Sequence, residues 1–180
     1  MFKVLFLLFS LLPCCTPHLS GFNSDDCSGA VGDIACDFEF EDKDANINTV
    51  WEHHEKVIIL DFSTMWCGPC QAASFYSETI LELYPEEEIV WITVLTSNMA
   101  GQIPTSEDLN TWTTHFELYN EQSVVLAGDR TLLRGYTIPG YPTFYIINKD
   151  MEITKVITGW SGVLTIQAID DAFASTEDPE

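Results

Sequence analysis

Apolar and polar residues follow one another in blocks that predict an α/β domain. Two runs, 57–62 and 89–95, are almost continuously apolar and rich in β-branched residues, which is typical of strands buried on both faces of a sheet. Between them, apolar residues recur at helical spacing from 68 to 84, so a helix is expected there, ended by Pro85. This strand–helix–strand order is the unit from which parallel sheets are built.

The flanking segments extend this unit in both directions. The alternation at 37–41 predicts a short edge strand, followed by a turn and a short helix before Lys56. The remaining expected elements are a helix capped by Ser106 and running to 118, a strand at 124–126, a turn with a short helical segment at 128–136, strands at 143–147 and 152–158, and a helix at 163–174. A parallel core with an antiparallel hairpin at its C-terminal side fits one α/β domain.

The N-terminus has the pattern of a targeting segment. A short apolar run, 4–12, follows Lys3 and is too short to span a bilayer as a helix of about 20 residues, but it suits a signal-peptide core. Leu-Leu-Pro-Cys-Cys comes next, which resembles a bacterial lipoprotein box ending at Cys14 or Cys15. Lipid anchoring at one of these cysteines is the favoured interpretation, with plain secretion and an uncleaved anchor as alternatives.

These patterns divide the 180 residues into four parts. We expect a signal peptide or lipoprotein leader at 1–20, a linker rich in Gly, Ser, Asp and Asn at 21–36, one domain at 37–174, and an acidic tail at 175–180. A domain of this size can bury a core without help from disulfides. The expected location is the cell envelope, on the periplasmic side.

The charge balance excludes one class of partner. Acidic residues number 28 against 7 basic ones, for a formal net charge of −21. Such a surface repels phosphate backbones and anionic lipid headgroups, so nucleic-acid binding is not expected, and membrane contact is expected only through the N-terminal anchor.

The six cysteines fall into three pairs. Two lie at the leader junction, Cys27 and Cys36 lie nine positions apart before the core, and Cys67 and Cys70 form a C-x-x-C motif. In an oxidising compartment Cys27 and Cys36 can form a local structural disulfide, although a second redox pair or two free thiols remain alternatives. A metal site is disfavoured because the nine-residue spacing does not resemble a zinc knuckle.

The C-x-x-C motif has the setting of a reactive thiol pair. It directly follows a buried strand and opens a helix, where unpaired N–H groups and the helix dipole favour a thiolate. Cys67 is therefore expected to be the exposed nucleophile and Cys70, one turn further and more buried, the resolving thiol. Pro69 is tolerated because its missing N–H would have no helical partner.

At this point the sequence resembles the thioredoxin superfamily over about residues 31–174. It is most similar to the membrane-tethered bacterial branch that includes thioredoxin-like proteins of cytochrome c maturation. The resemblance rests on Trp-Cys-Gly-Pro-Cys at 66–70, Leu60-Asp61-Phe62 before it, Gly140-Tyr141-Pro142-Thr143 before an apolar strand, Gly159 after the hairpin, and 31–38, where Cys36 replaces the usual proline. It implies a thioredoxin-like fold: a central mixed sheet flanked by helices, with an N-terminal extension and a central insertion.

The resemblance also implies roles for individual residues. Asp61 would accept the proton of Cys70, and Pro142 would be a cis-proline beside the disulfide that leaves neighbouring backbone groups free to pair with substrate. The residues expected to contact substrate are Trp66, Gly68, Pro69, Tyr141 and Thr143. The chain departs from cytosolic thioredoxin in lacking a lysine at 89–95 and in the longer segment before Pro142.

The expected function is that of a thiol-disulfide oxidoreductase that reduces disulfides of envelope proteins, without a cofactor. Its partners would be a protein disulfide substrate and an upstream electron-donor protein, and the chain is expected to be a monomer. Two alternatives are open: a thiol peroxidase, suggested by Thr64 three residues before Cys67, and a metal- or haem-handling assembly chaperone, suggested weakly by Met65.

Overall fold

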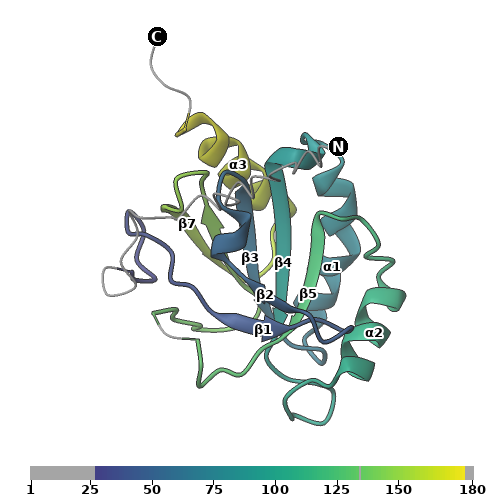
Figure 1. Cartoon of the computed structure of the whole chain (residues 1–180). Helices are drawn as coiled ribbons and strands as arrows, with labels where there is room; N and C mark the ends of the chain where they lie inside the picture. The colour runs from purple at the N-terminus through teal and green to yellow at the C-terminus, as the bar shows by residue number, and fades with distance from the viewer. Residues whose placement is uncertain (1–26, 134, 177–180) are drawn as a thin grey trace, which may run out of the picture.

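The computed structural model describes residues 27–133 and 135–176. The expected leader with Cys14 and Cys15, and the end of the acidic tail, lie outside these residues. One mixed sheet forms the centre of the molecule, with strand order β2-β1-β5-β4-β3-β6-β7 (Figure 1). Its strands are β1 (Glu39–Glu41), β2 (Ile47–Thr49), β3 (Val57–Ser63), β4 (Ile89–Leu95), β5 (Ser123–Ala127), β6 (Thr143–Ile147) and β7 (Ile153–Thr158).

Strands β3, β4 and β5 form the parallel part of the sheet, as their apolar sequences predict. All residues of β3 and β4 are buried, because both faces of these strands are covered. Strand β6 pairs antiparallel with β3 on the other side, and β7 completes the hairpin. In this register Asp61 lies between Thr93 of β4 and Phe144 of β6.

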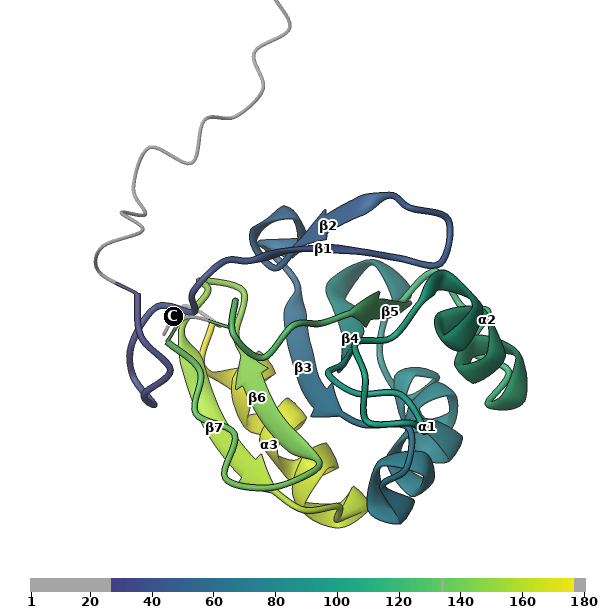
Figure 2. The ribbon, with the colours of Figure 1, turned by 90° about the horizontal axis from the view of Figure 1, so that it is seen from below.

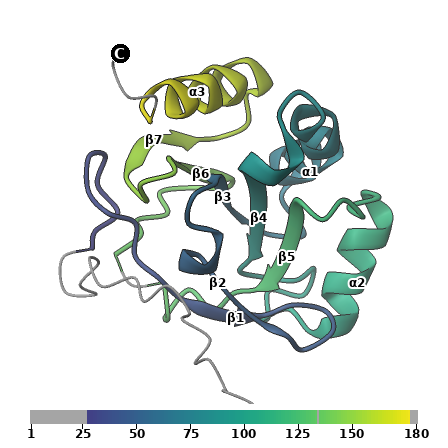
Figure 3. The same ribbon diagram turned by 45° about the horizontal axis from the view of Figure 1, so that its top comes forward.

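The N-terminal strands β1 and β2 continue the sheet beyond β5, and three helices cover one of its faces (Figures 2 and 3). The helices are α1 (Gly68–Leu81), α2 (Ser106–His115) and α3 (Gly162–Ala174). Helix α1 contacts β4, α2 contacts β5, and α3 contacts β3, β6 and β7. The other face is packed by aromatic residues of the N-terminal extension, Phe38 and Phe40 among them.

Several boundaries differ from the predictions. Helix α1 ends at Leu81, three residues early, because 82–84 form a turn before Pro85. Helix α2 ends at His115, and its cap is Thr105, whose side chain forms a capping box with Asp108.

Two other differences concern short segments. Strand β2 was not predicted. It pairs with β1 and forms the edge of the sheet, so β1, which was expected at the edge, is the second strand from it. In the described part of 128–136 there are turns and no helix.

The second half of the expected linker packs against the domain. Cys27 and Cys36 are joined by a disulfide, and Cys36 is buried in the core cluster. The backbone N–H of Ala35 donates to Met151 O at 2.8 Å, which ties this segment to the β6–β7 hairpin. Residues 27–36 are therefore an ordered N-terminal extension of the domain.

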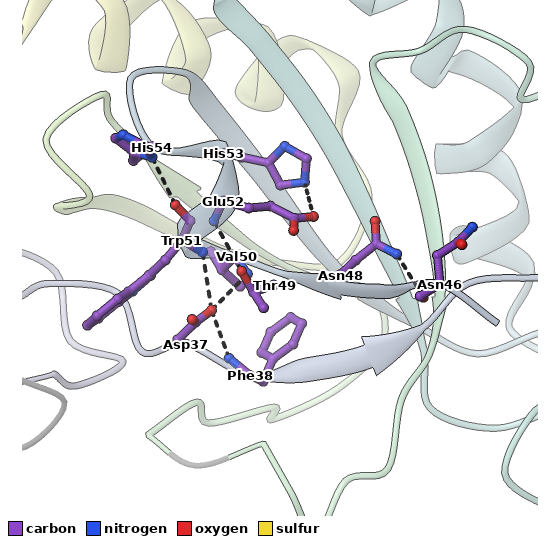
Figure 4. Close-up of polar contacts among 10 residues, drawn as sticks. All are labelled: Asp37, Phe38, Asn46, Asn48, Thr49, Val50, Trp51, Glu52, His53 and His54. Atoms are coloured by element: carbon purple, nitrogen blue, oxygen red, sulfur yellow. Dashed lines mark hydrogen bonds and ion pairs between the residues drawn. The ribbon is translucent and has the colours of Figure 1, made fainter. Parts of the chain in front are cut away.

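A single carboxylate organises the segment that directly follows this extension. Asp37 Oδ1 accepts hydrogen bonds from the backbone N–H groups of Phe38, Val50 and Trp51, at 3.0, 2.8 and 3.1 Å (Figure 4). Trp51 begins the short 3-10 helix η1 (Trp51–His53). This contact fixes the approach of the chain to β3, the strand that leads to the C-x-x-C motif.

Candidate active site

The two cysteines of the motif lie at the first turn of α1, directly after β3. Cys67 is the N-cap residue of the helix, and Cys70 sits one turn along, with their Cα atoms 5.2 Å apart and their sulfurs joined in a disulfide. The backbone N–H of Cys70 donates to Cys67 Sγ at 3.2 Å. The sulfur of residue 67 thus takes the place that a Ser or Asp oxygen takes at other helix starts.

The exposure of the two cysteines is unequal but smaller than expected. Cys67 was expected to be exposed, yet only 6% of its surface reaches solvent in this disulfide form, while Cys70 is fully buried. The cause is packing: both belong to a cluster with Met65, Leu95 and other apolar side chains. The order of accessibility, Cys67 before Cys70, still agrees with the roles that the sequence suggests.

Asp61 is a carboxyl group sealed inside the sheet. It has no exposed surface, and burial raises its pKa from the ordinary 3.8 to about 7, against the opposing effect of the Ser63 hydroxyl and of the nearby polar groups of Trp91 and Thr93. Ser63 Oγ donates to Asp61 Oδ1 at 2.6 Å. The other oxygen, Oδ2, is buried and has no hydrogen-bond partner among the described residues. Such a group can hold or release a proton near neutral pH.

The loop before β6 carries the expected cis-proline. The Tyr141–Pro142 peptide bond is cis, and Pro142 is buried. The N–H of Gly159 donates to Pro142 O at 2.8 Å, and Gly159 has a φ of 86°, which a side chain would disfavour. The two turns at this end of the β6–β7 hairpin are thereby held together.

The residues expected to contact substrate are not all available to a partner. Gly68 and Pro69 are exposed, and 52% of the Trp66 surface is exposed. Thr143 differs from the expectation, because it is fully buried and its hydroxyl donates to Gly140 O at 2.7 Å. Its side chain therefore stabilises the loop and does not face a partner.

Tyr141 connects the proline loop to the rest of the site. Its ring meets Trp66 edge to face at 6.0 Å, and its hydroxyl is hydrogen-bonded to Thr96 Oγ1 at 2.8 Å. The guanidinium of Arg130 lies 5.6 Å from the centre of the Tyr141 ring, within the range of a cation–π contact.

Sequence reasoning missed Ser63, Thr96 and Arg130. Ser63 directly follows the Leu60-Asp61-Phe62 segment. A hydroxyl two residues from a buried acid was the one feature of the sequence that could have indicated its contact with Asp61. Thr96 and Arg130 reach the site only through the fold and belong to no motif.

The described residues contain no group of three or more His, Cys, Asp or Glu side chains placed to hold a metal ion. Among them, no helix has the length and apolar character needed to cross a membrane. The paired sulfurs and the buried carboxyl supply groups for thiol–disulfide exchange and proton transfer.

Comparison with curated proteins gives three significant relatives of one kind. The chain is 25% identical over 140 residues to the thiol-disulfide oxidoreductase ResA of Geobacillus thermodenitrificans, which covers 78% of this chain and 76% of the relative. It is 27% identical over 130 residues to ResA of Bacillus subtilis, covering 71% and 67%. No protein-family model matches the chain.

Solved structures share the same fold. A thiol:disulfide interchange protein from Bacteroides sp. has a TM-score of 0.66 at 17% identity, covering 83% of this chain and 93% of that one. The exposed lipoprotein thioredoxin Etrx1 of Streptococcus pneumoniae has a TM-score of 0.56 at 24% identity, covering 73% and 98%. With the C-x-x-C pair at the start of α1, these likenesses show a thioredoxin-like fold and support the assignment of the chain as a thiol-disulfide oxidoreductase similar to ResA.

Proposed function

We propose that this protein reduces disulfide bonds of extracytoplasmic proteins, with Cys67 as the nucleophile and Cys70 as the resolving thiol. One observation carries the proposal: the N–H of Cys70 points to Cys67 Sγ at the first turn of α1. A backbone N–H and the positive end of a helix dipole stabilise a thiolate more than a thiol. We therefore expect this contact to stabilise the Cys67 thiolate in the reduced protein.

The first step is attack on the partner. The Cys67 thiolate attacks one sulfur of a substrate disulfide, so that a mixed disulfide forms and the other substrate sulfur leaves as a thiolate that takes up a proton. The exposed Gly68 and Pro69 leave room for the substrate chain beside Cys67.

The second step releases the partner. Cys70 loses its proton and attacks Cys67 Sγ, which forms the Cys67–Cys70 disulfide and frees the second substrate thiolate. We assign the proton of Cys70 to Asp61, because its pKa of about 7 suits a base at neutral pH and its Oδ2 has no competing partner among the described residues. The substrate gains two electrons from this protein. An upstream dithiol protein must then supply two electrons to reduce the Cys67–Cys70 disulfide again.

We infer the reducing direction of electron flow from the motif. Gly68 and Pro69 between the cysteines are the pair found in thioredoxin, whose potential of about −270 mV makes it a reductant. We propose a location on the periplasmic side of the cell envelope, with lipid attachment at Cys14 or Cys15. Support comes from the leader sequence and from Etrx1, which is itself named a lipoprotein.

Trapping tests the assigned roles. In the Cys70→Ser variant the mixed disulfide at Cys67 cannot be resolved, so covalent adducts with substrate proteins should accumulate on non-reducing gels. Cys67→Ser is the matched control and should form none. Adducts in the control at the level of Cys70→Ser, or none in either variant, would contradict the assignment.

A redox titration of the 67–70 pair tests the direction. The reductase proposal predicts a potential nearer to the about −270 mV of thioredoxin than to the about −120 mV of the oxidant DsbA. A potential close to that of DsbA would reverse the proposed direction.

A further inference from the structure

A small pocket lies between the loop that carries Met65 and helix α2, next to the apolar cluster that contains the disulfide. Met65 lines this pocket and is also in the apolar cluster that contains Cys67 and Cys70. Trp112 of α2 belongs both to the pocket wall and to the same cluster. The pocket and the reactive sulfurs therefore border the same apolar cluster.

The wall of the pocket is mostly apolar and partly adaptable. Trp112 and Phe116 of α2 form an edge-to-face pair with ring centres 4.5 Å apart, and Trp112 is 3% exposed. Met65 is held in place by packing, whereas Met99 is 67% exposed at the opening. The rest of the lining is Gln71, Thr111 and His115. Methionine side chains are flexible and accept apolar groups of several shapes.

The size of the pocket restricts what can enter it. Its volume is about 180 Å³. Sites for cofactors and other small molecules usually have about 300–1,000 Å³. The pocket is too small for a ligand of that class and has room for a single amino-acid side chain. Its apolar wall favours an aliphatic or aromatic one.

The proposed reaction brings such a side chain to the pocket. While a mixed disulfide exists, the partner's cysteine is bonded to Cys67, two residues from Met65 along this chain. An extended polypeptide advances about 3.5 Å per residue, so a residue within about three positions of the partner's cysteine comes within reach of the pocket. The mixed disulfide thus holds a side chain of the substrate near the pocket.

We propose that this pocket is a specificity subsite that takes an aliphatic or aromatic side chain within three residues of the substrate cysteine. The inference rests on the proposed function, because only disulfide exchange at Cys67 places a polypeptide there. The mobile thioether of Met99 at the opening lets leucine, methionine and phenylalanine all bind. A glycine or serine at the same substrate position leaves the pocket unfilled.

Peptide disulfides test this directly. The probes are five- to seven-residue peptides with one cysteine as a mixed disulfide with thionitrobenzoate, and with glycine, serine, leucine or phenylalanine at each of about three positions on either side. The release of thionitrobenzoate by the reduced protein gives the rate constant. At one position or more, leucine and phenylalanine should react about tenfold faster than glycine, in line with the burial of one apolar side chain.

Two variants tie the preference to the pocket. Thr111→Phe fills it from an exposed position of α2, and Met99→Gln replaces its apolar opening with a polar one. In both, the leucine-to-glycine ratio of rate constants should fall toward one. Leu83→Gln is the matched control, since Leu83 is exposed to a similar degree, 62%, and lines a different groove between α1 and α3. It should keep the wild-type ratio.

The outcomes separate the two proposals. If the wild-type protein reduces every peptide at the same rate, the subsite is refuted while the oxidoreductase function stands. If a preference exists and persists in both pocket variants, another surface reads the side chain and the subsite is again refuted. If no peptide disulfide is reduced by the wild-type protein, the proposed function itself fails.

Discussion

The hydroxyl of Ser63 donates a 2.6 Å hydrogen bond to Asp61 Oδ1, and neither side chain has any surface in solvent. This bond stabilises the ionised carboxylate against the cost of burial, which is the larger effect. Ser63 therefore sets how readily Asp61 gives up its proton. Because Oδ2 has no partner among the described residues, one oxygen is held and the other is available.

Removal of the Ser63 hydroxyl should raise the pKa of Asp61 further. In Ser63→Ala, the midpoint of the Asp61 carboxyl titration, followed by NMR in the disulfide form, should move above the wild-type value of about 7. A hydrogen bond to a charged group is worth about 1.5–3 kcal/mol, so the expected rise is about one to two pH units.

Ser74→Ala provides the control for this titration. Ser74 is a buried serine of α1 whose hydroxyl has no hydrogen-bond partner among the described residues. Its removal should leave the Asp61 midpoint in place. An unchanged or lowered midpoint in Ser63→Ala would show that the hydroxyl does not stabilise the carboxylate.

Ionisation of Asp61 should cost the folded protein stability at neutral pH. Its pKa is 3.8 ordinarily and about 7 when folded, so between these values the folded state binds more protons than the unfolded state. Stability then falls as pH rises through this range and levels off above it. The Asp61→Asn variant has no carboxyl group at this position, so it should not lose this stability.

The measurement is the free energy of unfolding of the disulfide form in urea, from pH 4 to pH 8. The free energy of unfolding of Asp61→Asn, relative to that of the wild type, should increase as pH rises, by on the order of 4 kcal/mol in total. Other carboxyl groups contribute equally to both proteins and cancel in the difference. A difference that is flat with pH, or that shrinks as pH rises, would contradict the assigned pKa.

The Cys27–Cys36 disulfide should act as a structural clip and not as a second redox centre. It closes a loop with a sequence separation of nine, and its removal in a Cys27→Ser/Cys36→Ser variant should lower the free energy of unfolding by about 2–3 kcal/mol. Urea unfolding checks this, with the rate of substrate disulfide reduction as the companion measurement. That rate should change less than about twofold, since Cys27 and Cys36 take no part in thiol exchange at Cys67. A large fall in the rate of substrate disulfide reduction, with an unchanged free energy of unfolding, would show that Cys27 and Cys36 take part in the redox reaction.

Much of the fold was predictable because its central strands and helices carry strong patterns. The apolar runs of β3 and β4 and the helical spacing of α1 reflect burial, which tolerates few exceptions. Strand β2 was missed because Ile47–Thr49 is three residues long and none of them is fully buried. The cap of α2 was displaced by one residue because Thr105 and Ser106 are both good caps, and only the reciprocal bond with Asp108 decides between them.

The site was predictable where a residue belongs to a motif and not where it is brought in by the fold. Cys67, Cys70, Asp61 and Pro142 have fixed spacing to their neighbours in sequence. The burial of Thr143 and of Cys67 depends on packing from distant segments, which no local pattern reveals. For the same reason the extension at 27–36 resembled a linker: its buried residues Ala35 and Cys36 pack in a core cluster with residues of the β6–β7 hairpin, far along the chain.

The account depends most on the acidity of the first sulfur, which the pH dependence of alkylation measures directly. In the reduced protein, iodoacetamide modification of each cysteine is followed by mass spectrometry as pH is varied. Residue 67 should react faster than residue 70, with a midpoint well below the about 8.5 of a free cysteine. Faster modification of residue 70, or a midpoint for residue 67 at or above about 8.5, would contradict the account.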